Sequence, residues 1–128
     1  MISTKYYITE TSNDIIGVEI CSAIKNIYSM IIGAGDSLNM SSSLFQKSIN
    51  EMIYITKYFK GNINTALGLA GVGDLYVSAA GGRNSKMGGY LGQGYTFNNA
   101  KKKFMLNETV EGEQLAREIA PFLSLIHI

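Results

Sequence analysis

Cysteine and histidine are almost absent from this sequence: its 128 residues include one of each, Cys21 and His127. A single cysteine excludes a disulfide within the chain. No cluster of cysteine, histidine and aspartate has the spacing of metal ligands, so we expect no metal site. His127 lies in residues 123–128, which we expect to be a non-native tail, and it is left out of the candidate site.

Charge is also scarce. Only 16% of the residues are charged and the formal net charge is +1, whereas 46% are hydrophobic. This composition is typical of one globular domain with a core, and it excludes a disordered chain. We interpret the three lysines at 101–103 as a solvated helix face. We therefore expect no nucleic-acid partner, and an anionic ligand has to be held by a few placed groups.

Neither a leader nor a membrane span is expected. Residues 1–11 lack the apolar stretch of a secretory signal, so we expect a cytoplasmic protein. The run from Ile15 to Ile32 has the length of a membrane span, but Glu19 and Lys25 lie inside it. Each such charge costs about 3 kcal/mol to place at the centre of a bilayer. We therefore interpret the run as a core helix.

Hydrophobic periodicity predicts an all-α fold. Residues 1–13 are expected to form a lead-in, with a short strand or an extended segment at 6–9. Residues 14–122 are expected to form a single helical domain. The helices that the pattern predicts are 15–32, 43–60, 74–80, 96–105 and 111–123.

Capping residues and glycines set the predicted boundaries. Ser43 and Gln46 have the spacing of a capping box, which predicts that the second helix begins at Ser43. Asp74 follows the glycine-interrupted turn at 68–73 and can cap a short helix. Residues 81–94 are rich in glycine, and we predict no helix there.

Lys25 lies in the middle of the first predicted helix, among apolar residues. An ammonium group in such surroundings must be desolvated, paired or open to a cleft, because an unpaired buried charge is costly. A lysine of that kind is suited to proton transfer. The alternative is a lysine whose stem packs while its amine reaches water. The buried face that the helical spacing predicts consists of Ile16, Ile20, Ala23, Ile24, Ile27 and Ile31.

Four short motifs carry a family resemblance. They are GVEICSAIKN at 17–26, GLAGVGDL at 68–75, GGRN at 81–84 and TVEG at 109–112. In this order and at these separations, they resemble the C-terminal helical domain of NAD(P)-dependent glycerol-3-phosphate dehydrogenases. The resemblance covers about residues 14–122, nearly the whole chain.

The resemblance implies an all-α substrate domain of the 6-phosphogluconate-dehydrogenase-like type, which in that family follows an N-terminal Rossmann domain. We expect this Rossmann domain to be absent, because no G-x-G-x-x-G motif stands between a strand and a helix. NAD or NADP would then be bound mainly by the missing domain, and this fragment alone would not turn over substrate. A complete enzyme is expected to be a homodimer.

The resemblance also implies a catalytic pair. Lys25 matches the catalytic lysine, which exchanges a proton with the oxygen of glycerol 3-phosphate or dihydroxyacetone phosphate. Asp74 matches the aspartate that pairs with this lysine, and Asn26 would hydrogen-bond the substrate. Without the resemblance, Asp74 is equally well explained as a helix cap.

A phosphate site is implied by the third motif. Arg83 resembles the arginine that holds the substrate phosphate, helped by Asn84 and by the flexible backbone at Gly82. The chemistry fits, because a guanidinium forks onto phosphate oxygens and glycines let backbone N–H groups approach closely. Ser78 is a further candidate for contact with the substrate. Taken alone, an arginine after two glycines would ordinarily be a surface charge.

Cofactor contacts are implied for Arg83, Thr109 and Glu111. The alternative for Glu111 is a glutamate in the first turn of a helix, where it favours the helix dipole. Two other functions remain open for the chain. One is the helical domain of a related β-hydroxyacid dehydrogenase that acts on a carboxylate substrate. The other is a non-catalytic helical interaction module.

Overall fold

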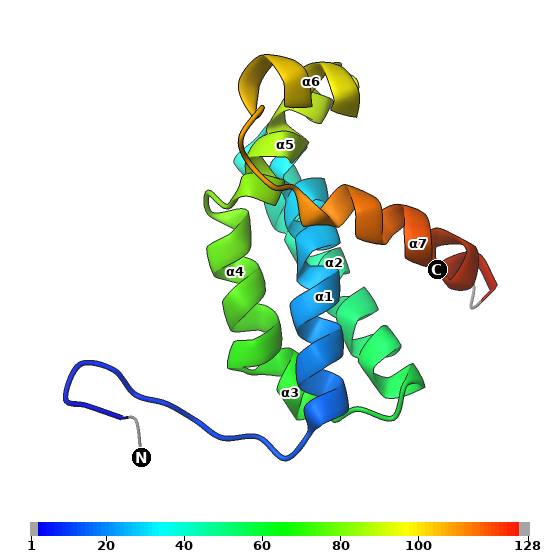
Figure 1. The fold of residues 1–128 in the computed structure, drawn as a ribbon. Helices are drawn as coiled ribbons and strands as arrows, with labels where there is room; N and C mark the ends of the chain where they lie inside the picture. The colour runs from blue at the N-terminus through cyan, green and yellow to red at the C-terminus, as the bar shows by residue number, and fades with distance from the viewer. Residues whose placement is uncertain (1–2, 126–128) are drawn as a thin grey trace.

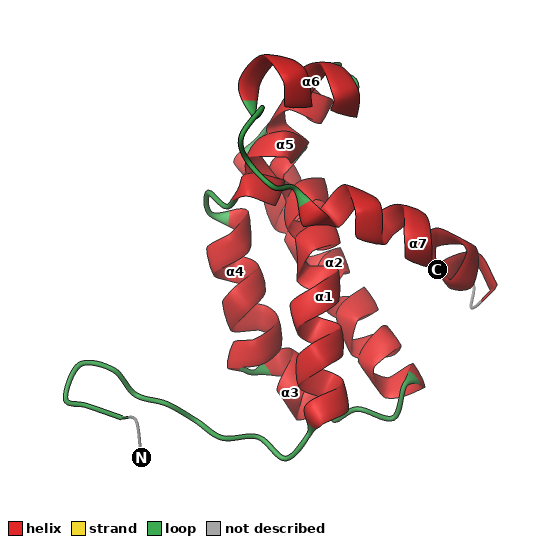
Figure 2. Cartoon of the chain, viewed as in Figure 1, coloured by secondary structure: helices red, strands yellow, loops and turns green. Residues whose placement is uncertain are grey.

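The computed structural model describes residues 3–125, and all regular elements within that range are helical (Figure 2). The prediction of an all-α fold is therefore confirmed. The elements, in chain order, are α1 (Ile15–Gly33), α2 (Leu38–Tyr58), α3 (Ile63–Leu67), the π-helix η1 (Leu69–Gly73), α4 (Asp74–Ala79), α5 (Arg83–Gly92), α6 (Phe97–Phe104) and α7 (Glu111–Leu125).

Helix α1 is the centre of the molecule. It contacts α2, α4, α5 and α7, which surround it in Figure 1. By length and hydropathy α1 could cross a membrane, but here it lies among other helices as the core helix that the sequence predicts. A globular bundle, with α1 as its most protected element, follows from this arrangement.

The buried face of α1 differs from the prediction. Ile24 and Ile27 are buried as expected, but Ile16 and Ile31 are 48% and 41% exposed. Because apolar residues occur on every side of this helix, the spacing that was followed did not identify the face that neighbours cover. The buried residues of α1 are Gly17, Cys21, Ile24, Ile27, Tyr28, Ser29 and Ile32.

Helix α2 begins earlier than predicted. Its N-cap is Ser37, whose side chain accepts a hydrogen bond from the Met40 amide, whereas Ser43 lies inside the helix. Ser37 has the extended backbone that an N-cap needs. The predicted capping box was therefore wrong, because a local motif cannot show which of several serines stands at the chain's change of direction.

Two helices were not predicted, α3 and α5. Helix α5 contains glycines in its interior, which lowers its intrinsic helix propensity. Its packing explains why it forms: an ideal Cβ atom on Gly88 would lie 1.9 Å from the Met30 carbonyl oxygen, and one on Gly92 would lie 2.5 Å from that of Ala34. The glycines therefore let α5 lie against the backbone of α1, and this tertiary contact offsets the weak propensity.

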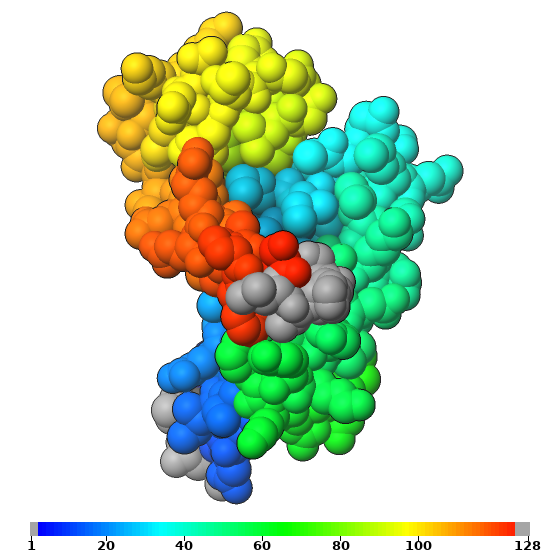
Figure 3. All heavy atoms as spheres, turned by 90° about the vertical axis from the view of Figure 1, so that its right-hand side faces the viewer, coloured from blue at the N-terminus to red at the C-terminus, as the bar shows by residue number. Residues whose placement is uncertain are grey.

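The two ends of the chain frame this bundle. Residues 3–13 form a loop that extends away from the helices, without the strand considered at 6–9 (Figure 1). At the other end α7 lies across the bundle and continues to Leu125 (Figure 3). There the Phe122 ring packs 5.3 Å from that of Phe59, centroid to centroid. The last part of the predicted non-native tail, residues 126–128, lies outside the described residues.

Candidate active site

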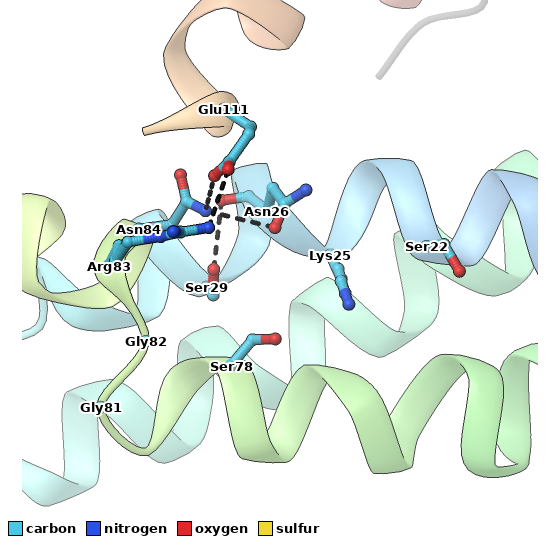
Figure 4. A pocket seen from close by; sticks show the side chains of 10 residues that line it. All are labelled: Ser22, Lys25, Asn26, Ser29, Ser78, Gly81, Gly82, Arg83, Asn84 and Glu111. Atoms are coloured by element: carbon cyan, nitrogen blue, oxygen red, sulfur yellow. Dashed lines mark hydrogen bonds and ion pairs between the residues drawn. The ribbon is translucent and has the colours of Figure 1, made fainter. Parts of the chain in front are cut away.

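A pocket of about 550 Å³ opens between α1, α4 and the first turns of α5 and α7 (Figure 4). Its walls are mainly polar, and they come from four segments that are distant in the sequence. The lining residues are Ser22, Lys25, Asn26, Ser29, Ser78, Gly81, Gly82, Arg83, Asn84 and Glu111. The pocket is therefore lined by six of the residues predicted to be catalytic or to bind substrate, and by Glu111. The six are Lys25, Asn26, Ser78, Gly82, Arg83 and Asn84.

The wall that α1 contributes is a polar stripe. Ser22, Lys25, Asn26 and Ser29 stand at i, i+3, i+4 and i+7, so they share one face of the helix. The Ser29 hydroxyl donates to the Asn26 carbonyl oxygen at 3.1 Å. Ser22 and Ser29 were missed by the sequence analysis, which followed the apolar residues of this helix. The spacing of its polar residues is the signal that could have identified both.

Lys25 reaches from this stripe to Asp74. Its Nζ atom donates to Asp74 Oδ2 across 49 residues of sequence, and the two side chains are 21% and 36% exposed. The lysine is thus half-buried, paired and open to the pocket. Asp74 can make this contact because η1 ends at Gly73 and turns the chain directly into α4.

The prediction that Asp74 caps a helix was wrong. Helix α4 begins at Asp74 itself, Gly73 takes the cap position, and no side chain caps the helix. The carboxylate instead faces Lys25. Ser78 follows one turn later on the same helix and lines the pocket opposite α1 (Figure 4).

Arg83 lies at the other end of the pocket, where α5 begins. A Cβ atom on Gly82 would lie 2.6 Å from the Ser78 carbonyl oxygen, so this turn can pass close to α4 only with a glycine. No side chain caps the N-terminus of α5. The Arg83 Nη2 atom donates to Glu111 Oε1 at 2.9 Å. The Arg83 side chain is 54% exposed, and its guanidinium has further N–H groups for a ligand.

Asn84 is buried beside Arg83 and joins three helices. Its Nδ2 group donates to Asn26 Oδ1 on α1 and to Glu111 Oε2 on α7, both at 3.2 Å. Its Oδ1 atom accepts from the Gly112 amide at 2.9 Å. Glu111 is also the first residue of α7, so the helix-start position suggested as its alternative is correct as well.

Thr109 and Cys21 lie apart from these groups. Thr109 is exposed and lines a separate hollow between α6 and α7, so the structure does not bring it to the pocket. Cys21 is fully buried, its thiol lies 3.6 Å from the Thr56 hydroxyl of α2, and its burial raises the pKa of the thiol. It therefore stays protonated and packs in the core. Within residues 3–125, no three histidine, cysteine, aspartate or glutamate side chains lie close enough to hold a metal ion.

The geometry is that of a site for small anionic molecules. One end offers an amine held by a carboxylate, and the other offers a guanidinium beside an uncapped helix N-terminus. The amine can exchange a proton with a ligand oxygen, and the second end can bind a phosphate or carboxylate group. Between them the pocket is lined by hydroxyl and amide side chains, among them Ser78 and Asn26 (Figure 4).

Known proteins match this chain in sequence. Residues 14–126 match the family model described as NAD-dependent glycerol-3-phosphate dehydrogenase C-terminus. The NADP(+)-dependent glycerol-3-phosphate dehydrogenase of Archaeoglobus fulgidus is 36% identical over 112 residues, covering 80% of this chain and 33% of the relative. The glycerol-3-phosphate dehydrogenase [NAD(P)+] of Xylella fastidiosa is 32% identical over 115 residues, covering 85% and 33%. The chain thus spans about a third of the length of the curated relatives it matches.

Solved structures agree with these matches. The crystal structure of glycerol-3-phosphate dehydrogenase from Coxiella burnetii has a TM-score of 0.83 at 28% identity, over 91% of this chain and 37% of that one. DsGPDH of Dunaliella salina has a TM-score of 0.85 over 98% of this chain and 26% of that one; at 24% identity it supports the fold alone. The chain therefore belongs to the glycerol-3-phosphate dehydrogenase family, and it carries that family's helical C-terminal domain.

Proposed function

We propose that this chain is the substrate-binding and catalytic helical part of an NAD- or NADP-dependent dehydrogenase that interconverts glycerol 3-phosphate and dihydroxyacetone phosphate. The observation that carries the proposal is that Lys25, which is paired with Asp74, and Arg83 line the same pocket. A phosphorylated three-carbon substrate needs both groups, one for its reacting oxygen and one for its phosphate. The names of the relatives support the same substrate and cofactor.

Lys25 is the proton donor in the direction of ketone reduction. NADPH or NADH, when bound, supplies the hydride that reaches the carbonyl carbon. The Lys25 Nζ group then gives a proton to the carbonyl oxygen, and it takes a proton from the hydroxyl group in the reverse direction. Asp74 pairs with the amine and holds it in place.

Arg83 and the start of α5 hold the phosphate. The guanidinium can donate two parallel hydrogen bonds to phosphate oxygens. The backbone N–H groups of the first turn, which begins after Gly82 and includes Asn84, add the partial positive charge of a helix N-terminus. Asn26 and Ser78 contribute polar groups that can contact the substrate between the phosphate site and Lys25.

The cofactor and the rest of the protein complete the site. Arg83 and Glu111 lie at the pocket's edge, where they can contact the cofactor, and a contact from Thr109 would require the cofactor to extend beyond the pocket. We assign the main cofactor binding to a Rossmann domain of the same enzyme. The complete enzyme is proposed to be a cytoplasmic homodimer.

The phosphate site is tested by titrating the 128-residue chain with glycerol 3-phosphate and following backbone amide shifts by NMR. Arg83→Ala should weaken binding at least about tenfold, because a bidentate charged contact is lost. Arg117→Ala is the matched control: Arg117 is also exposed and also paired with a glutamate, but on α7 outside the pocket. Equal effects of the two variants would refute the assignment.

The reaction is tested in a chimaera. This chain would replace the matching C-terminal third of the Archaeoglobus fulgidus relative, and the product would be assayed for oxidation of glycerol 3-phosphate with NADP. Turnover supports the proposal. A folded chimaera that binds NADP but oxidises only non-phosphorylated hydroxy acids would favour the β-hydroxyacid alternative, and one that oxidises neither would favour a non-catalytic module.

A further inference from the structure

We propose that Gly71 is a positioning residue for the Lys25–Asp74 pair. It allows the π-helical turn η1 to form, and this turn sets the rotation of α4 at which Asp74 faces Lys25. Gly71 itself lies outside the pocket, in a segment that contacts α3 on one side and α4 on the other. Its effect on the pair can be observed without substrate. Its consequence for catalysis rests on the proposed function, which the inference deepens by naming what directs the carboxylate.

Two backbone hydrogen bonds characterise the π turn. The Gly73 amide donates to the Gly68 carbonyl oxygen at 3.1 Å. The next amide, that of Asp74, donates to the carbonyl oxygen of Leu69. Both bonds reach back five residues along the chain, one more than in an α-helix. The turn that leads into α4 therefore contains one residue more than an α-helical turn, an insertion that is frequent at functional sites.

This extra residue decides which side of α4 faces α1. Successive residues of an α-helix are rotated by about 100° around the helix axis. With an α-helical turn in place of η1, Gly73 would take nearly the place of Asp74, and the exposed Val77 would take that of Ser78 in the pocket wall. The Asp74 carboxylate would then turn toward the core, where Leu75 is fully buried. The rotation that η1 sets is thus the one that gives the pocket a carboxylate and the core a leucine.

The close contact between η1 and α3 requires a glycine at position 71. Gly71 is buried, and a Cβ atom on it would lie 1.9 Å from the Ala66 carbonyl oxygen and 2.5 Å from the carbonyl carbon. Ala66 is 1% exposed and belongs to the core, so its backbone has little room to move. Any side chain at position 71 must therefore push η1 away from α3. Because η1 leads directly into α4, the direction of Asp74 changes with it.

The pair can be followed by NMR of the Lys25 ammonium group in the isolated chain. An ammonium group that is hydrogen-bonded to a carboxylate exchanges its protons with water more slowly than a free one, and loss of the signal in Lys25→Met assigns it. In Gly71→Ala this exchange should become at least about tenfold faster, because a hydrogen bond between charged groups is lost. The measurement is made below the Tm of each variant, so that it reports on folded molecules.

Gly73 provides a matched control within the same turn. A Cβ atom on Gly73 would lie 3.4 Å from Leu69 Cδ2, the end of a flexible side chain. The backbone of Gly73 is helical, with φ −62° and ψ −50°, so alanine fits there without strain. Gly73→Ala should therefore leave the exchange of the Lys25 ammonium group unchanged.

Removal of the extra residue should repair the effect of Gly71→Ala. Deletion of Val72, which is only partly buried, shortens the π turn to an α-helical one, in which alanine is favoured and α4 keeps its rotation. Slow exchange at Lys25 should then return. In the chimaera with the Archaeoglobus fulgidus relative, kcat should fall at least about tenfold in Gly71→Ala and recover with the deletion, because the amine that transfers the proton is fixed only when it is paired.

A purely structural role of Gly71 predicts a different result. The Tm of Gly71→Ala would then fall while its folded molecules kept slow exchange at Lys25, and this would overturn the inference. Fast exchange in the parent chain, or fast exchange that deletion of Val72 does not reverse, would overturn it as well. If Gly71→Ala does not fold, the variant with the deletion decides: slow exchange supports the inference, and fast exchange or failure to fold contradicts it.

The two readouts also separate this inference from the proposed function. If the chimaera does not oxidise glycerol 3-phosphate but the exchange at Lys25 responds to both changes as stated, the function fails and the positioning role of Gly71 stands. If the chimaera is active and Gly71→Ala leaves both kcat and the exchange unchanged, the function stands and the positioning role fails.

Discussion

Lys25 combines two properties that a proton-transferring residue needs, a fixed amine and access to a ligand. Its pair with Asp74 fixes the amine, and the pocket gives the access. In the chimaera, Lys25→Met should lower kcat/KM by about 10²- to 10⁴-fold, the range that general acid–base catalysis contributes. Steady-state assays measure this. The control is Lys102→Met on the exposed side of α6, and similar losses in both variants would exclude the proposed role.

Asp14 stabilises two helix starts at once. Its carboxylate accepts from the Gly17 amide at 3.0 Å, which caps α1, and from the Asn62 amide at 2.8 Å, which ties the start of α3 to the same point. A hydrogen bond from the Thr65 side chain lowers the pKa of Asp14 below its usual value of 3.8, and the Asn62 and Gly17 amides lower it further. The charged carboxylate therefore stabilises the folded chain.

The pH dependence of this contribution has a definite sign. Because the folded pKa of Asp14 is depressed, its stabilisation is fully present above the unfolded value of 3.8 and is lost as the pH falls through the folded pKa. Asp14→Asn should lower the Tm at neutral pH, and its difference from the parent should shrink below pH 3.8. Thermal melts across this range measure it. Asp36→Asn, at an exposed turn, is the control; a constant difference at all pH values would contradict the prediction.

At the scale of elements, the contact between α1 and α5 decides the shape of the pocket. Gly88 lies so close to Met30 that a side chain there would meet the backbone of α1. Any separation of the two helices moves the start of α5, and with it Arg83 and Asn84. The glycines of α5 therefore serve the site, although none of those in its interior lines the pocket.

Two neighbouring glycines give a matched test of this contact. Gly88→Ala should destabilise the chain by about 1–3 kcal/mol, because the methyl group has no room and the helices must move apart. Gly89→Ala should stabilise it by about 0.5–1 kcal/mol, since its Cβ atom would lie 3.6 Å from the Gly33 carbonyl oxygen, an ordinary contact, and alanine favours the helix. Urea denaturation measures both. Changes of the same sign would contradict the structure.

At the scale of the whole molecule, exposed apolar side chains occur on α4, which forms one wall of the pocket, and on η1 before it. Tyr76 and Val77 are 66% and 69% exposed on α4, the helix that also carries Asp74 and Ser78, and Leu69 just before it is 65% exposed. The chain covers only about a third of the length of the relatives. We expect their additional domain to cover this surface in a complete enzyme and to close the open side of the pocket.

That docking surface can be tested by comparing the chain with the chimaera. Tyr76→Ser together with Val77→Ser should leave the Tm of the isolated chain nearly unchanged, because exposed substitutions cost little. The same pair should lower the Tm of the chimaera, where the residues would be buried between domains. Leu38→Ser, at a position 90% exposed on α2, is the control. If the Tm of the chimaera does not change, the contact between the domains lies elsewhere.

The sequence showed some of the site and missed other parts for identifiable reasons. Motifs pointed to Lys25, Asp74 and Arg83, which line or border one pocket although 49 residues separate the first two. The serines of α1 were missed because its apolar residues dominated the pattern. Helix α5 was missed because its glycines disfavour a helix locally, and only packing against α1 offsets that.

The sequence by itself determined that the chain is helical, where most of its helices lie, and which family it resembles. These properties follow from the order of neighbouring residues, because hydrophobic spacing and local motifs act within a few turns of chain. Only the tertiary structure decided which face of α1 is buried, that Asp74 pairs instead of capping, and that one amide of Asn84 joins α1, α5 and α7. Those contacts join residues that are far apart in the sequence. They depend on how the helices pack against one another, which a pattern of neighbouring residues does not show.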